Sequence, residues 1–196
     1  MTRVLTKDKF AEIVQALHDD CIVAFPTDTV YGIGVLCSST TAAERMKNAK
    51  KRPETKPFPV MVASLADLEA IAWLSERERR LALRFMPGAL TMVLRKKEAI
   101  ANGLDTVAVR IPNDLFALQL LEKVGPMYVT SANLSGEPAC NTDREVLEQL
   151  DGRIDYIVAG EAFSKTASTI IDCTGSEIKV LRQGDLRIED INKARL

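Results

Sequence analysis

The sequence has 196 residues, of which 46% are hydrophobic and 27% charged, so the chain is long enough to bury a full core and suits a single domain spanning 1–196. The formal net charge of -1 excludes a global positive field that would attract nucleic acid, and any anion site must come from a local concentration of cations. The aromatic fraction of 5% argues against a base-stacking surface for single-stranded nucleic acid.

The first half of the chain alternates helix and strand patterns. Periodic apolar residues predict a helix over 6–20, and short apolar runs predict strands over 21–25 and 58–63. A second helix is expected over 40–50, ending before Pro53 and Pro57. Ser64 and Ser75, each followed three residues later by an acid, predict the starts of two short helices.

The second half continues the pattern. Strands are expected over 90–94, 107–111, 127–130, 154–159, 169–173 and 179–181. Asn113 is expected to cap a helix that reaches about Lys123, and Thr142 to cap one that reaches about Leu150. This order predicts an α/β fold with a mixed parallel and antiparallel sheet flanked by helices.

Cysteine and histidine usage narrows the chemistry. The four cysteines form no CxxC pair, so we expect small buried thiols rather than disulfides or a zinc site. His18 is the single histidine and is expected at a helix C-terminus, which leaves no multi-histidine metal site. The polar first ten residues and the lack of an apolar run near about 20 residues predict a cytoplasmic protein without a membrane span.

Three polar segments are candidates for a ligand site. The sequence PTDTVYG follows the predicted strand 21–25, TSANLSG follows the strand 127–130, and Ser168 lies in a third polar segment. Ligands of open α/β sheets bind at the carboxyl ends of strands, and hydroxyl, amide and glycine groups reach phosphates there. We therefore expect these segments to meet at one edge of the sheet, although each alone could be an ordinary turn.

Several lysines and arginines are candidates for binding an anionic ligand. Six lysines and arginines lie between Arg45 and Lys56, and Lys50 and Arg52 stand where the predicted helix ends. A lysine point charge beside an arginine fork suits a polyphosphate, whereas a solvated helix end is the plain alternative. Arg110 and Arg182 each end an apolar strand, which is typical either of ligand contacts, to a carboxylate and a phosphate respectively, or of structural ion pairs. No P-loop and no GxGxxG after a strand is present.

Seven motifs in order give a family resemblance. They are FPTDTVYGIG (25–34), KKRP with KPFPV (50–60), MPGALTMVL (86–94), DTVAVRIP (105–112), TSANLSGEPA (130–139), ASTIID (167–172) and VLRQG (180–184). The chain resembles the YrdC/TsaC family of threonylcarbamoyl-AMP synthases from about residue 5 to 184. The resemblance implies a twisted YrdC-like sheet around a deep basic cleft, in a short form without an added C-terminal domain.

The resemblance also implies roles for individual residues. ATP is expected at Lys50, Arg52, Thr106, Ser131, Asn133 and Arg182, with Lys50 and Arg52 as the catalytic pair. L-threonine is expected at Thr27, Arg110 and Ser168. Thr29 stands where relatives also carry alanine, and Met61 where longer relatives carry histidine.

The implied reaction joins L-threonine, bicarbonate or CO2, and ATP into threonylcarbamoyl-AMP and pyrophosphate, the first step of the t6A modification of tRNA. Downstream transferase proteins would use the product. The reaction needs positioning and charge neutralisation, supplied by Lys, Arg and Mg2+, more than a protein nucleophile. The alternatives are a double-stranded-RNA-binding translation or ribosome-maturation factor, and a carbamoyl-transfer module of hydrogenase maturation.

Overall fold

The computed structural model describes residues 1–53, 56–100 and 102–194. Its helices are η1 (Lys7–Lys9), α1 (Phe10–His18), α2 (Thr40–Ala49), α3 (Leu65–Ile71), α4 (Glu76–Phe85), α5 (Leu115–Val124), α6 (Asp143–Leu150) and α7 (Ile188–Ala194). Its strands are β1 (Arg3–Leu5), β2 (Val23–Phe25), β3 (Gly32–Leu36), β4 (Val60–Met61), β5 (Ala72–Trp73), β6 (Leu90–Lys96), β7 (Thr106–Arg110), β8 (Met127–Ser131), β9 (Tyr156–Val158), β10 (Thr169–Asp172) and β11 (Lys179–Arg182). The mixed α/β prediction is confirmed.

Several predicted boundaries were wrong. Asp114, not Asn113, caps α5, because its Oδ1 accepts the Ala117 N–H at 2.8 Å. The expected strand over 58–63 is only two residues long as β4. No element was predicted at β1, β5 or α7, which have three, two and seven residues.

Strand β3, which contains Gly32 and Gly34, is the longest strand that was not predicted. Both glycines are fully inside the sheet, where β3 pairs antiparallel with β2 and β8. A Cβ on Gly34 would lie 2.9 Å from Met127 Cε, and one on Gly32 would lie 3.0 Å from Val129 Cγ1. The glycines therefore serve close packing across β3 and β8 rather than a turn.

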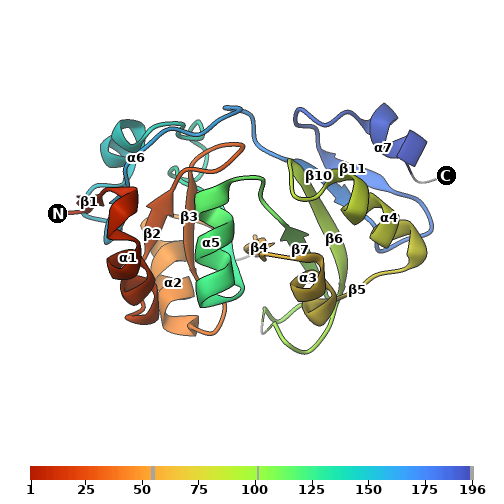
Figure 1. Cartoon of the computed structure of the whole chain (residues 1–196), viewed down its shortest axis with the longest axis horizontal. Helices are drawn as coiled ribbons and strands as arrows, with labels where there is room; N and C mark the ends of the chain where they lie inside the picture. The colour runs from red at the N-terminus through yellow and green to blue at the C-terminus, as the bar shows by residue number, and fades with distance from the viewer. Residues whose placement is uncertain (54–55, 101, 195–196) are drawn as a thin grey trace.

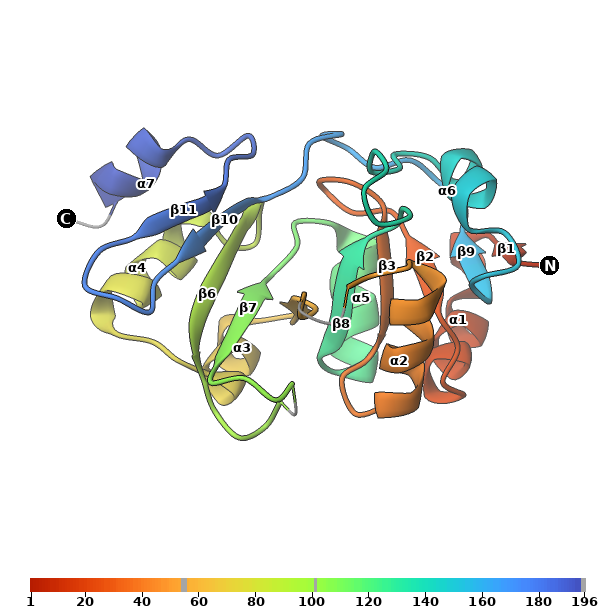
Figure 2. The same ribbon diagram turned by 180° about the vertical axis from the view of Figure 1, so that it is seen from behind.

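One sheet runs through the described residues in the order β1-β9-β2-β3-β8-β4-β7-β6-β10-β11, with β5 paired to β6. Figure 1 shows the β1-to-β8 half and the β7-to-β11 half on opposite sides of the molecule, with the short β4 between them. Figure 2 shows α2 in front of the first half, whereas the strands of the second half face the viewer directly. The two halves are therefore strongly twisted relative to each other about β4.

Hydrophobic cores lie on both faces of the sheet. On one face, Val60, Tyr128 and Met92 belong to a cluster that also contains buried residues of α2, α3 and α4. On the other, Met61 and Val129 pack with residues of α1 and α5. On the same face, the neighbouring strands β7 and β6 carry Ala108 and Val93, which are only half-buried. Helices α1 and α5 therefore cover this face over β2, β3 and β8 and leave it open over β7 and β6.

Candidate active site

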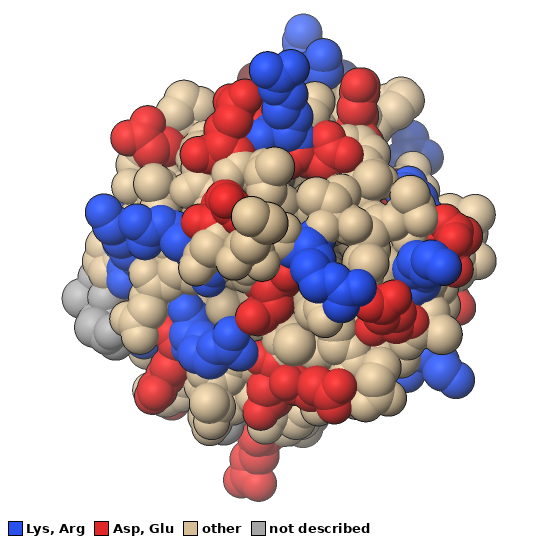
Figure 3. Space-filling view, turned by 90° about the vertical axis from the view of Figure 1, so that its left-hand side faces the viewer, with Lys and Arg blue, Asp and Glu red and all other residues tan. Residues whose placement is uncertain are grey.

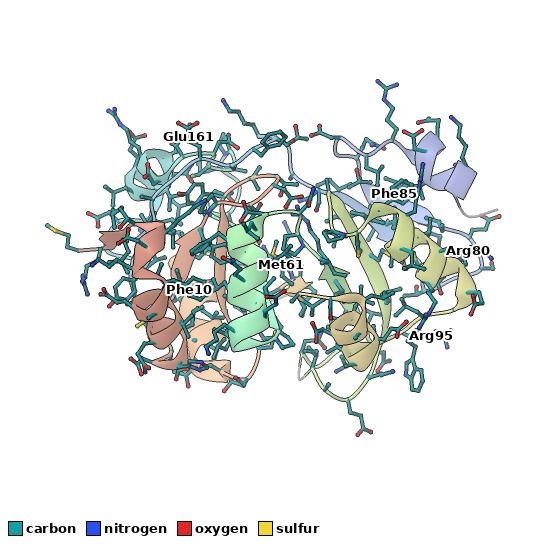
Figure 4. The ribbon with its side chains drawn as sticks, viewed as in Figure 1. Phe10, Met61, Arg80, Phe85, Arg95 and Glu161 are labelled. Carbon is teal, nitrogen blue, oxygen red and sulfur yellow. The ribbon has the colours of Figure 1, made fainter. Side chains whose placement is uncertain are left out.

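A cavity of about 190 Å3 lies where the covered part of the second face meets its open part. Figure 4 labels Met61, which lines the cavity and lies at the centre of the molecule between the two halves. The lining comes from both halves and comprises Thr27, Thr29, Val30, Tyr31, Gly32, Arg52, Pro59, Met61, Thr91, Arg110, Val129, Thr130, Ser131, Ala167, Ser168, Ile170 and Arg182. It includes three arginines and, among the described residues, no aspartate or glutamate.

The loop after β2 supplies a pair of buried hydroxyls. Thr27 and Thr29 are 2% and 1% exposed, and their Oγ1 atoms lie 3.1 Å apart. Thr27 Oγ1 donates to the Val30 carbonyl at 2.7 Å and accepts the Thr29 N–H at 3.1 Å. The turn thus fixes its own two hydroxyls, and main-chain N–H groups of residues 163–165 hold it from outside by donating to the carbonyls of residues 27–29.

Arg110, the last residue of β7, links this loop to the other half of the sheet. Its Nε donates to Gly88 O at 2.9 Å, its Nη1 to Thr29 Oγ1 at 2.7 Å, and its Nη2 to Asp28 Oδ1 at 2.6 Å. Burial lowers the pKa of Arg110, and Asp28 opposes that effect. Three of the five guanidinium N–H groups are thus used, leaving one on Nη1 and one on Nη2.

Ser168 and Arg182 form a second polar group at the cavity. Arg182 donates from Nε to Ser168 O at 3.0 Å and from Nη2 to Ser168 Oγ at 3.2 Å, and Ser168 Oγ lies 2.8 Å from Thr91 Oγ1. Burial lowers the pKa of Arg182, and the charge of Arg110 lowers it further. Two guanidinium groups therefore repel each other here, and a bound anion would relieve that repulsion.

Gly184, the last residue of the VLRQG motif, packs against the backbone of residues 167–169. A Cβ at this position would lie 2.8 Å from Ser168 C and 2.7 Å from Thr169 N, so only glycine allows the two backbones to approach. The Gly184 N–H donates to Thr169 Oγ1 at 2.9 Å. This contact sets the position of Ser168 in the cavity wall.

Lys50 is placed differently from expectation. Its side chain is buried, and Nζ donates to Ser131 O and Asn133 O, each at 2.5 Å. Burial, followed by the charge of Arg52, lowers the pKa of Lys50 from 10.5 to about 7. The structure thus brings Lys50 to Ser131 and Asn133 as predicted, but through main-chain carbonyls, and Lys50 does not line the cavity.

Ser131 and Arg52 do line the cavity. Ser131 Oγ donates to Asn133 Oδ1 at 2.5 Å, while Asn133 Nδ2 donates to Leu134 O and Glu137 O at 2.8 Å, so Asn133 holds its own turn outside the cavity wall. Arg52 donates to the carbonyls of Lys56 and Pro57 at 3.0 and 2.9 Å and retains N–H groups for a ligand.

Two expectations about placement differ from the structure. Thr106 starts β7, about 13 Å along the strand from Arg110 and outside the cavity lining, although the two residues share a face. Ser168 lies directly before β10, at the amino end of that strand. Strand β10 runs parallel to β8, whose carboxyl end carries Ser131. The prediction that three carboxyl ends of strands meet at one edge of the sheet was therefore wrong. Thr27 follows β2 and Ser131 is the last residue of β8, and these two strands run parallel.

Neither Thr91, which lines the cavity, nor Asp28, which pairs with Arg110 beside it, was a predicted site residue. Thr91 lies inside a strand, where nothing marks it as different from a core position. Asp28 stands between two threonines in the PTDT segment, and that position was the available signal.

The remaining predicted residues are the four cysteines and the single histidine. All four cysteines are free, and His18 is the exposed last residue of α1, as predicted. In the described part of the chain, no helix is long and apolar enough to cross a membrane, and no group of three or more His, Cys, Asp or Glu could hold a metal ion.

Comparison with known proteins decides the family. The family model for Sua5, YciO and YrdC proteins, described as telomere recombination, matches residues 15–184. The chain belongs to the Sua5/YciO/YrdC family. Threonylcarbamoyl-AMP synthases of Pyrococcus abyssi and Bacillus subtilis are 42% and 37% identical to it over 184 and 191 residues, or 90% and 93% of this chain.

The alignments cover 54% and 55% of those two relatives, so this chain spans about half their length. A threonylcarbamoyl-AMP synthase of Vibrio cholerae is 33% identical, with 90% of this chain and 98% of the relative covered. Among solved structures, P. abyssi Sua5 complexed with L-threonine aligns with a TM-score of 0.93 and 36% identity, covering 99% of this chain and 60% of that chain. E. coli YciO aligns with a TM-score of 0.89 and 23% identity over 97% of this chain and all of that chain, a likeness of fold.

Proposed function

We propose that this Sua5/YciO/YrdC protein is a threonylcarbamoyl-AMP synthase, a nucleotidyl-transferring enzyme. It would convert L-threonine, bicarbonate or CO2, and ATP into threonylcarbamoyl-AMP and pyrophosphate. The observation that carries the proposal is the cavity itself, where Arg110 and Arg182 face two buried threonine hydroxyls from the opposite half of the sheet and Arg52 adds a third cation. The names of the relatives at 33–42% identity support it.

The cavity volume of about 190 Å3 is small for a nucleotide and suits an amino acid. The remaining N–H groups of Arg110, one on each terminal nitrogen, match the two oxygens of a carboxylate. The triphosphate would then lie toward Arg52, Arg182 and Ser131, and the base outside the enclosed space. Lys50 would act through the carbonyls of the TSAN turn.

The chemistry follows from this placement. The threonine ammonium releases one proton to water, the neutral amine adds to the carbon of CO2, and loss of a second proton from the nitrogen to water gives a carbamate. A carbamate oxygen attacks the α-phosphorus, the bond between that phosphorus and the bridging oxygen breaks, and pyrophosphate leaves with its electron pair. Arginine N–H groups stabilise the charge on the phosphoryl oxygens, and no protein nucleophile is required.

The lining does not by itself form a Mg2+ site, because it offers hydroxyl oxygens and, among the described residues, no carboxylate. Mg2+ would take its ligands from phosphate oxygens and water and enter with the nucleotide. The product would pass to threonylcarbamoyl-transferring proteins that act on tRNA in the cytoplasm.

The test is pyrophosphate release by the purified protein with ATP and bicarbonate, measured with and without L-threonine. Threonine should raise the rate, and serine should serve less well. A rate that does not depend on threonine would overturn the proposal. Binding of double-stranded RNA is the second candidate, but the face in Figure 3 intersperses Lys and Arg with Asp and Glu and presents no large patch of one sign.

A further inference from the structure

Asp28 carries the carboxylate nearest to the arginines of the cavity. Its side chain is 11% exposed, and its Oδ1 accepts a hydrogen bond from Arg110 Nη2 at 2.6 Å. The structure gives Asp28 Oδ2 no hydrogen-bond partner among the described residues, and this oxygen is not one of the fully buried polar atoms that lack partners. Asp28 lies beside the cavity lining rather than in it, and its Oδ2 has no partner in the described part of the chain, at a largely buried position where a charged group is costly to leave unsatisfied.

The position of Asp28 beside Arg110 determines which ligand groups can contact both side chains. Nη2 donates one N–H to Asp28 and keeps the other, so a ligand carboxylate on that second N–H would lie within about 5 Å of the Asp28 carboxylate. In an α-amino acid, the ammonium is two bonds from the carboxylate carbon. A zwitterion bound to Arg110 by its carboxylate can thus place its ammonium toward Asp28 Oδ2.

We propose that Asp28 binds the α-ammonium group of the amino-acid substrate and makes the cavity select a zwitterion over a simple carboxylate. This inference rests on the proposed function, because it assumes that an amino acid binds at Arg110. The Arg110–Asp28 pair presents one positive and one negative group side by side, which matches the charge order of an α-amino acid. An anion without an ammonium would meet the Asp28 charge with no compensation.

The experiment compares binding of L-threonine with binding of its 2-hydroxy analogue, 2,3-dihydroxybutanoate of the same configuration, by isothermal titration calorimetry. The wild-type protein should bind threonine about tenfold to a hundredfold more tightly than the analogue, as one charge-assisted hydrogen bond predicts. Equal affinity for the two compounds would overturn the proposal without any variant. If the wild type binds neither compound and releases no pyrophosphate with threonine, the proposed function fails instead.

Asp28→Asn keeps the shape of the side chain and removes its charge. Its affinity ratio for threonine over the analogue should fall to near one, with ATP binding retained. Equal losses for both compounds would show that Asp28 only positions Arg110, and an unchanged ratio would show no role; either result overturns the proposal. Asp155→Asn is the matched control, because Asp155 also pairs with an arginine, Arg45 at 3.0 Å, but Arg45 does not line the cavity, whereas Arg110, the partner of Asp28, does. It should keep the wild-type ratio.

Discussion

The buried ammonium of Lys50 gives a prediction about stability and pH. The structure lowers the pKa of Lys50 from 10.5 to about 7 through burial and the charge of Arg52. Between these two pH values the unfolded chain binds the proton and the folded chain releases it, so the unfolding free energy rises as the pH rises. The penalty for the buried charge is complete below pH 7 and is relieved toward pH 10.5.

The magnitude can be worked out for Lys50→Met, which preserves the length of the side chain and removes the amine. Relative to this variant, the unfolding free energy of the wild type should rise by about 2.5 kcal/mol between pH 7.5 and 9.5. The neutral amine still has two N–H groups for Ser131 O and Asn133 O, so these bonds can survive the loss of charge. In the variant both carbonyls lose their donor, which costs about 1–3 kcal/mol each at any pH.

Urea unfolding of both proteins at pH 7.5, 8.5 and 9.5, followed by circular dichroism, measures the difference. Groups that titrate alike in both proteins cancel in that difference, and an unchanged m-value would show that the unfolded states are comparable. A difference that stays flat across the three pH values would refute the reasoning, since it would mean that the Lys50 ammonium is as solvated in the folded state as in the unfolded chain.

Three further predictions concern the cavity. Arg52→Ala should weaken ATP binding tenfold or more in calorimetry, because charge-assisted hydrogen bonds to phosphate are lost. The control is Lys51→Ala, which changes the exposed neighbouring lysine and should leave the affinity for ATP at the wild-type value. Arg110→Lys should raise the KM for threonine about tenfold with little change in ATP binding, because lysine keeps the charge and loses the fork; an unchanged KM would contradict the carboxylate role. Gly184→Ala should lower the melting temperature and weaken threonine binding, because the added Cβ meets the backbone at Ser168; wild-type values of both would show that this backbone can move freely.

The sequence predicted the fold class and much of the site for identifiable reasons. Apolar runs and capping residues mark elements locally, so α3, α4 and α6 begin where Ser64, Ser75 and Thr142 predict. The seven ordered motifs indicated most of the cavity residues because each motif is a segment that reaches the cavity. The prediction failed where contacts are long-range.

Two cases show this limit. Nothing local tells that Gly32 and Gly34 belong to a strand, since the reason is the packing of β8 against them. No local sequence feature indicates that the Lys50 amine points away from the cavity and donates to carbonyls at the end of β8, because Ser131 is 81 residues away in the sequence. The pair Arg110 and Asp28 was likewise invisible, because it joins two segments whose approach depends on the twist about β4.

The division of the sheet at β4 has a consequence for the energetics of binding. Thr27 and Ser131 belong to one half, and Arg110, Ser168 and Arg182 to the other, so a ligand in the cavity cross-links two halves of a sheet that the two-residue strand β4 joins. Ligand at a hundred times its Kd adds about 2.7 kcal/mol to the stability of the bound form. That energy would act against separation of the halves, so amide hydrogens of β4 should report occupancy of the cavity by slower exchange with solvent.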